Sequence, residues 1–233
     1  MRGRVRLTSL IVSGVVFHGS HIVLSSTRLR GNLRDQLGER GYLALYSVVA
    51  LATFAWFITA FIHAPTVTLW PSAPWTVFIP LVTMPVASIL LIAGYSTPNP
   101  TAVGMERVAG DDDPAPGIMR VTRHPIMWAI GLWGLSHVAV NDDLASLLFF
   151  GSLAALALGG TVLIDRKKRL ALGSNWPRLA EVTSNVPFLA IVVGRTRLRL
   201  HEIGLLRVVA GLLLYAVLLL GHPLYTGQAI IIP

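Results

Sequence analysis

The chain has 233 residues, of which 54% are hydrophobic and 13% are charged, against about 25% charged residues in soluble domains. This composition, with a mean hydropathy of +0.66, excludes an ordinary water-soluble domain and indicates a membrane protein. The absence of cysteine excludes disulfides, thiolate metal sites and covalent haem attachment, and the net charge of +8 does not indicate nucleic-acid binding, because the cations flank apolar segments.

A membrane-spanning helix needs about 20 mostly apolar residues, and the sequence predicts about six of them. The expected spans are residues 7–27, 42–63, 76–95, 125–140, 144–164 and 203–220. A cleaved signal peptide is the alternative for the first span, but its length and the lack of a clear cleavage site favour a retained helix. Residues 186–193 are too few to cross and are expected at the membrane interface. The sequence therefore predicts an all-α polytopic membrane helix bundle, a single domain over residues 1–233.

Cationic residues predict which loops face the cytoplasm. Most of them fall after the first, third and fifth spans, whereas only Arg2, Arg4 and Arg6 precede the first span and oppose this pattern. By the positive-inside rule, those three loops are cytoplasmic and both termini lie outside, in a bacterial inner membrane. The acidic run at residues 111–113 belongs to a polar loop and is expected to be solvated.

Histidine supplies the polar chemistry expected inside the bilayer, because every carboxylate lies in or beside a loop. His18 and His21 share one face of the first span, and His137 lies near the end of the fourth. Ionisable groups within a bilayer usually face a bundle interior and have a partner or a function. A cofactor shared by His21 and His137 is therefore one hypothesis, and hydrogen bonding between helices is the alternative.

Haem b suits this composition, because it requires imidazole nitrogens on iron, apolar walls and cations near its propionates. Trp133 is an expected wall. Arginines are expected at the cytoplasmic edge, where propionates could reach them: Arg30, Arg120 and Arg123. The alternative is zinc or non-haem iron on His18, His21 and a third histidine. A count of the helical rise places His18 nearer than His21 to the depth of His137, so His18 is the backup ligand.

Short motifs distributed along the chain carry a resemblance to a known family. In chain order they are HIVLSSTRLRGNLRDQLGERGY at 21–42, PNP at 98–100, TRHP at 122–125, LWGLSH at 132–137, ND at 141–142, GxxW at 173–176, PF at 187–188 and GH at 221–222. Together they resemble the NnrU membrane family over nearly the whole chain. That family is related to the haem b zeta-carotene isomerases, and some members are associated with nitrite and nitric oxide metabolism. The resemblance implies a haem b protein with a lipid or polyene substrate among membrane lipids, or a role in denitrification.

The resemblance also implies roles for individual histidines. His21 precedes a matching LR…GxRxY pattern, and His137 follows the Arg-His-Pro motif at the family's spacing, so both match the haem ligands of the isomerase. His124 matches a histidine that the isomerase requires, which implies a catalytic role. The stretch after His21 is slightly longer here, so His18 is kept as the backup ligand.

The sequence is compatible with two other functions. The protein could bind or sense nitric oxide through haem without catalysis. The Arg-His-Pro motif at residues 123–125 also resembles the isoprenylcysteine methyltransferases, which bind S-adenosylmethionine. Asn141 matches that family too, but Asp165 with a basic neighbour replaces its acidic pair, which puts S-adenosylmethionine binding in doubt. The sequence does not determine the oligomeric state.

Overall fold

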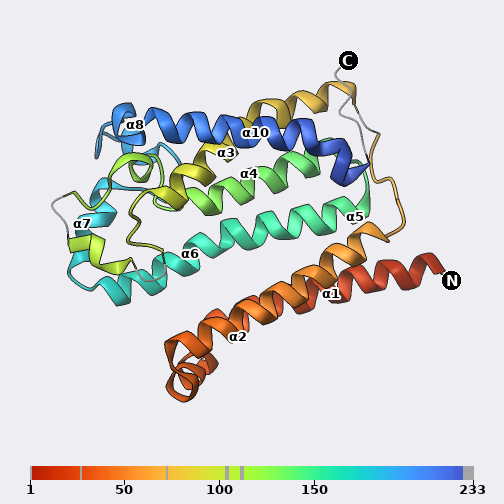
Figure 1. Cartoon of the computed structure of the whole chain (residues 1–233), viewed down its shortest axis with the longest axis horizontal. Coiled ribbons are helices and arrows are strands. Elements are labelled where there is room, and N and C mark those ends of the chain that lie inside the picture. Colours follow the sequence, from red (N-terminus) through yellow and green to blue (C-terminus); the bar gives the residue numbers. More distant parts are fainter. Residues whose placement is uncertain (1, 27, 72, 103–104, 111–112, 228–233) are drawn as a thin grey trace. The chain divides into compact units, whose positions relative to one another are not determined.

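The computed structural model describes the whole chain except residues 1, 27, 72, 103–104, 111–112 and 228–233 (Figure 1). The chain divides into two compact units, Met1–Ser72 with Asn141–Ser152 and Ala73–Val140 with Leu153–Pro233. The described residues are helical and contain no β-strand beyond one isolated bridge, which confirms the predicted all-α bundle. A single domain over the whole chain stays a prediction.

The first unit is built on α1 (Arg2–Ser26) and α2 (Arg28–Ile62), which lie side by side (Figure 1). Gly14 of α1 allows a close approach, because a Cβ there would lie 3.0 Å from the ring of Phe57. The Phe57 side chain is buried in this contact, at 1% exposure. Helices in lipid associate through such close packing at small residues, because lipid tails remove most of the hydrophobic drive.

The helix α2 begins earlier than the sequence predicts. The residues before the expected span at 42–63 are helical up to Gly38, where φ is 71° and ψ is 170°. Glycine adopts this left-handed φ without the strain that a Cβ would cause. Past this kink, the Tyr42 hydroxyl donates to the Leu24 carbonyl at 2.9 Å, which ties the start of the apolar part of α2 to the end of α1.

A later part of the chain returns to the first unit. This part contains α5 (Leu144–Ser146) and the π-helical turn Leu147–Gly151. The Leu69 amide donates to the Asp142 carbonyl at 2.7 Å, and the Phe149 ring lies 4.8 Å from Phe57 and 4.5 Å from Phe61 between centroids. Aromatic packing therefore connects the returning segment to α2.

Four long helices lie among the described residues of the second unit. They are α3 (Phe78–Ser96), α4 (Pro125–Val140), α6 (Ser152–Leu172) and α10 (Leu205–Thr226). In Figure 1, α3 lies beside both α4 and α10. A Cβ on Gly211 of α10 would lie 2.7 Å from the Cα of Ile89 on α3, and one on Gly131 of α4 would lie 2.6 Å from Leu158 on α6. Small residues again set the distance between helices.

Five helices in the described part of the chain are long and apolar enough to cross a membrane. They are Gly3–Ser25, Arg28–Ile62, Pro74–Ser96, Leu144–Leu172 and Leu205–Thr226. The predicted fourth span corresponds to α4, an apolar helix of 16 residues that is shorter than the other five. The described residues thus support a membrane protein with five spans and one shorter apolar helix. The inner membrane and the outside position of both termini stay predictions.

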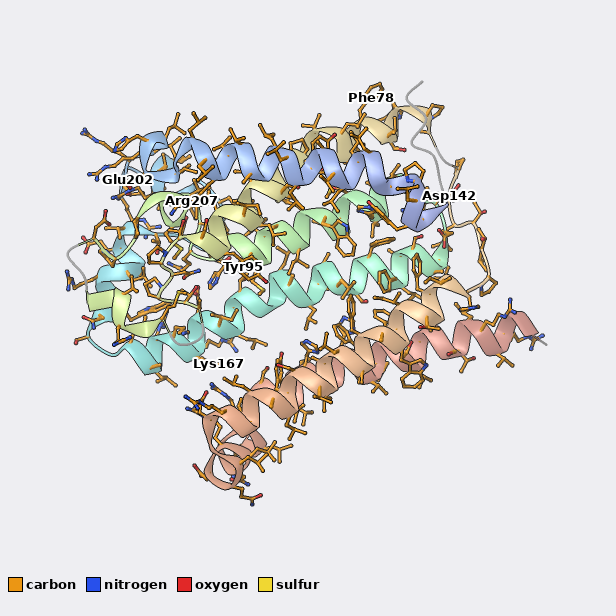
Figure 2. The ribbon with its side chains drawn as sticks, in the orientation of Figure 1. Phe78, Tyr95, Asp142, Lys167, Glu202 and Arg207 are labelled. Atoms are coloured by element: carbon orange, nitrogen blue, oxygen red, sulfur yellow. The ribbon has the colours of Figure 1, made fainter. Side chains whose placement is uncertain are left out.

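Short helices connect the long ones in the second unit. They are the 3₁₀ turns Pro74–Val77, Glu106–Gly110 and Gly117–Arg120, with α7 (Asn175–Val182), α8 (Leu189–Val192) and α9 (Leu200–Ile203). Arg207, labelled in Figure 2, donates to the carbonyl and the hydroxyl of Ser96, both at 3.0 Å. Because Ser96 ends α3, this arginine satisfies a carbonyl that the helix leaves unpaired.

Candidate functional site

The predicted ligand His21 lies on α1 in the first unit. Its Nδ1 is 3.1 Å from the Phe17 carbonyl oxygen, one turn earlier on the same helix. The ring centroid is 4.3 Å from that of Phe17 and 5.6 Å from that of Tyr46. When Nδ1–H donates to the carbonyl, Nε2 carries the lone pair that a metal requires, which is the usual arrangement of a ligating histidine.

The backup ligand His18 has a different environment. Its Nδ1 is 2.7 Å from the Gly14 carbonyl oxygen, and its Nε2 is 3.0 Å from the Ser152 carbonyl oxygen. Both ring nitrogens therefore lie against backbone carbonyls of the first unit. Iron binding at Nε2 would require this second contact to break, so the geometry favours His21 over His18.

The second predicted ligand, His137, lies on α4 in the second unit. Its Nδ1 is 2.7 Å from the Trp133 carbonyl oxygen, and the two ring centroids are 5.2 Å apart. This is the same hydrogen bond to the preceding turn that His21 makes. Since His21 and His137 belong to different units, their pairing around one iron stays a prediction.

A cavity of about 240 Å³ lies among α3, α4 and α10 in the second unit. Its lining is almost entirely apolar: Met84, Ala87, Ser88, Leu91, Ala129, Ile130, Trp133 and Leu218. Trp133, which the sequence proposes as a cofactor wall, therefore lines this cavity and also holds His137 through its carbonyl. Apolar walls with a few polar groups are typical of small-molecule sites.

His124 of the Arg-His-Pro motif is buried, with 1% of its side chain exposed, at the start of α4. Its Nε2 is 2.7 Å from Oδ1 of Asp165, near the end of α6. Arg123 donates from Nε to the same carboxylate at 3.1 Å and from Nη1 to the Thr183 hydroxyl at 3.0 Å. The Arg123 guanidinium also lies 5.4 Å from the Trp176 ring. This cluster connects the first turn of α4 to α6 and α7.

Arg120 is at the centre of a second polar cluster. It donates to Glu202 at 2.8 Å and to the Thr196 hydroxyl at 3.1 Å, and it forms an ion pair with Asp113. Hydrogen bonds to the Glu202 carboxylate lower its pKa to about 2. The bond from Arg120 has the largest effect, and the bond from Arg199 adds to it. The predicted contact of Arg120 and Arg123 with haem propionates is not tested by these pairings and stays a prediction.

Arg30, the remaining predicted propionate contact, lies in the first unit. Its guanidinium carbon is 5.9 Å from the centroid of the Tyr42 ring. The Tyr42 hydroxyl in turn donates to the Leu24 carbonyl near the end of α1. Its role toward a cofactor stays a prediction.

The sequence interpretation missed the carboxylates of these clusters. Asp113 pairs with Arg120 while its side chain stays 44% exposed, which agrees with the expected solvated loop, and residues 111 and 112 lie outside the described part of the chain. Asp165, which the sequence places in or beside a loop, lies within α6, between an apolar stretch and the basic residues 166–169. A single carboxylate in that position is expected to be paired, which is the signal that could have identified it.

A multi-histidine metal site is the alternative to haem that the sequence leaves open. Among the described residues, no group of three His, Cys, Asp or Glu side chains could hold a metal ion. Zinc and non-haem iron sites use three or four protein ligands, and the alternative built on His18, His21 and a third histidine stays a prediction. Haem b requires at most two protein ligands.

Comparison with known proteins identifies one family. No curated protein and no solved structure matches the chain. A family model described as NnrU protein matches residues 9–229, a range that includes His21, His124 and His137 and all the long helices except the first residues of α1. This match confirms the resemblance found in the sequence motifs. The chain belongs to the NnrU family.

Proposed function

We propose that this NnrU-family protein is a membrane haem b protein that isomerises a cis double bond in a lipidic polyene. The observation that carries the proposal is the double role of Trp133, which lines the apolar cavity and accepts the hydrogen bond of His137. An apolar chain held in that cavity would lie next to the residue that orients a candidate iron ligand. Family membership supports the proposal, because the resemblance extends to a haem-dependent isomerase.

Haem b suits the donor chemistry of the described residues. His21 and His137 would hold the iron through Nε2, since each directs Nδ1 to a carbonyl of its own helix. When bound, haem b supplies a redox-active iron that can interact with the electrons of a carbon–carbon double bond.

The chain's own residues would bind and orient the substrate. The cavity walls from α3 and α4 exclude water and fix an apolar chain by contact, which lowers the entropic cost of reaching the reactive geometry. We assign His124 to positioning, because its buried ring is held by Asp165 at the start of the helix that carries Trp133 and His137. A direct catalytic contact is not required of it.

A cavity-filling variant tests this proposal. Purified protein reconstituted with haem is mixed, under reducing conditions, with a cis-polyene in vesicles, and the isomers are separated by chromatography. Met84→Trp places a larger ring in the cavity and is expected to lower the conversion rate at least tenfold without changing the haem spectrum. Val82→Trp is the matched control, since Val82 is exposed on the same helix and does not line the cavity.

Equal conversion by the Met84→Trp and Val82→Trp variants would overturn the role of the cavity. No conversion by the haem-loaded wild type, combined with nitric oxide binding to the reduced protein, would favour the alternative of a nitric oxide sensor. Methyl transfer is tested by calorimetry with S-adenosylmethionine. We do not propose it, because the Asp165 carboxylate at the position of the acidic pair is already paired with His124 and Arg123.

A further inference from the structure

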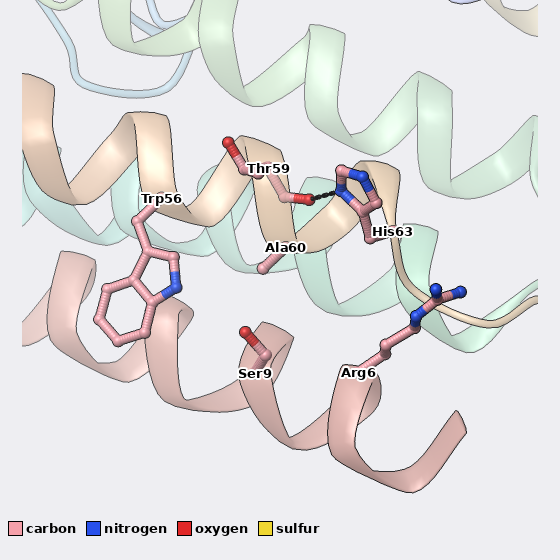
Figure 3. A pocket seen from close by; sticks show the side chains of 6 residues that line it. All are labelled: Arg6, Ser9, Trp56, Thr59, Ala60 and His63. Atoms are coloured by element: carbon pink, nitrogen blue, oxygen red, sulfur yellow. Dashed lines mark hydrogen bonds between the residues drawn. The ribbon is translucent and has the colours of Figure 1, made fainter. Parts of the chain in front are cut away.

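A cavity of about 200 Å³ lies between α1 and α2 in the first unit (Figure 3). Its lining residues are Arg6 and Ser9 from α1, with Trp56, Thr59, Ala60 and His63 from the α2 side. A water molecule occupies about 30 Å³ of liquid, so the cavity has room for a chemical group of several non-hydrogen atoms. Ala60 has the smallest side chain of these lining residues, and it is buried, with 7% exposed.

The lining presents donors and one fixed positive charge. Arg6 forms no ion pair with any residue in the described part of the chain, and the described lining contains no carboxylate. Figure 3 shows its guanidinium extending toward His63, while the Trp56 ring lies at the other end of the cavity. The His63 Nδ1 is 2.7 Å from the Thr59 carbonyl oxygen, which fixes the ring orientation. Such a lining suits an anion with an apolar extension.

The cavity lies at one end of both helices. Arg6 is in the second turn of α1, which begins at Arg2, and His63 directly follows the last residue of α2, Ile62. These helices are candidate membrane spans, so their ends are expected at the level of the lipid headgroups. Tryptophan is enriched at this level on both sides of a membrane, and a cation there lies within reach of the lipid phosphates.

We propose that this cavity binds the headgroup phosphate of an anionic phospholipid. The Arg6 guanidinium pairs with the phosphate oxygens through charge-assisted hydrogen bonds, and the Ser9 hydroxyl donates to them. The Trp56 ring covers the glycerol and the first acyl carbons. Ala60 leaves the space that the headgroup occupies. This site is independent of haem binding and of the polyene proposal.

A binding experiment on the full chain tests the assignment. The purified protein in detergent is titrated by calorimetry with short-chain phosphatidylglycerol, with phosphatidylcholine of the same chain length, and with inorganic phosphate. We expect binding of phosphatidylglycerol, with an affinity that falls about tenfold in Arg6→Gln, the loss typical of one charge-assisted hydrogen bond. Arg4→Gln removes an exposed cation of the same helix that does not line the cavity, and it is expected to leave the affinity unchanged.

Ala60→Leu is expected to abolish binding by filling the cavity, with the helical circular dichroism spectrum retained. Equal losses in the Arg6→Gln and Arg4→Gln variants would show a diffuse charge effect and overturn the site. Full binding by a folded Ala60→Leu variant would do the same. Equal affinity for inorganic phosphate would assign the site to the free anion and overturn the lipid assignment, and equal affinity for phosphatidylcholine would overturn the preference for an anionic lipid.

Discussion

Asp165 provides a direct test of how the start of α4 is held. Its carboxylate accepts from His124 Nε2 at 2.7 Å and from Arg123 Nε at 3.1 Å. Asparagine keeps one acceptor oxygen, but it replaces the other with an amide N–H and removes the negative charge. A hydrogen bond to a charged group is worth about 1.5–3 kcal/mol, so Asp165→Asn is expected to lower the free energy of unfolding by about 2–4 kcal/mol.

The assay is thermal unfolding of the purified protein in detergent. A loss of about 1 kcal/mol corresponds to about 2–4 °C for a chain of this size, so the Tm is expected to fall by about 4–16 °C. The control is Glu181→Gln, which neutralises an exposed carboxylate of the same unit and is expected to change the Tm by about 1 °C or less. Equal Tm values for the two variants would refute the view that this cluster stabilises the fold.

Two further predictions concern packing and pH. Gly211→Ala places a Cβ 2.7 Å from the Ile89 backbone, so it is expected to lower the free energy of unfolding by about 1–3 kcal/mol. A Cβ on Gly159 meets no atom within 4 Å, so Gly159→Ala is expected to leave the stability unchanged. Equal Tm values for the two variants would contradict this. The pKa of Glu202 is about 2 in the folded protein against 4.5 when unperturbed, so its ionised form stabilises the fold above about pH 4.5, and this contribution is lost as the pH falls toward 2. Glu202→Gln is expected to lower the Tm at neutral pH and to make the Tm fall less steeply as the pH is lowered. A fall in Tm as steep as that of the wild type would contradict this.

The apolar spans could be predicted from the sequence because their boundaries are local features. Proline at position 125 suits the first turn of a helix, and α4 begins there and ends at Val140, as expected. The early start of α2 was not predicted, because residues 28–37 are polar and were assigned to a loop. Leucine, arginine and glutamine have high helix propensity, which accounts for the helix at residues 28–37. The chain changes direction at Gly38, where glycine adopts a non-helical conformation.

The candidate site could be predicted only in part. His21 and His137 could be identified from sequence because ionisable residues inside an apolar span are rare, and each then bonds within its own helix. The pairing of His124 with Asp165 could not be predicted, because 41 residues separate them and only tertiary packing brings α4 and α6 together. The pairing of Arg120 with Glu202 could not be predicted for the same reason, since these residues are 82 positions apart in the chain.

The absorption spectrum of the purified, haem-reconstituted protein tests the central proposal most directly. We expect one haem b per chain with a low-spin bis-imidazole spectrum in the wild type. His21→Ala and His137→Ala are each expected to lose the low-spin bands, while His63→Ala, a histidine proposed for no iron contact, is expected to keep them. Failure of the wild type to bind haem, or unchanged low-spin spectra in both ligand variants, would contradict the account.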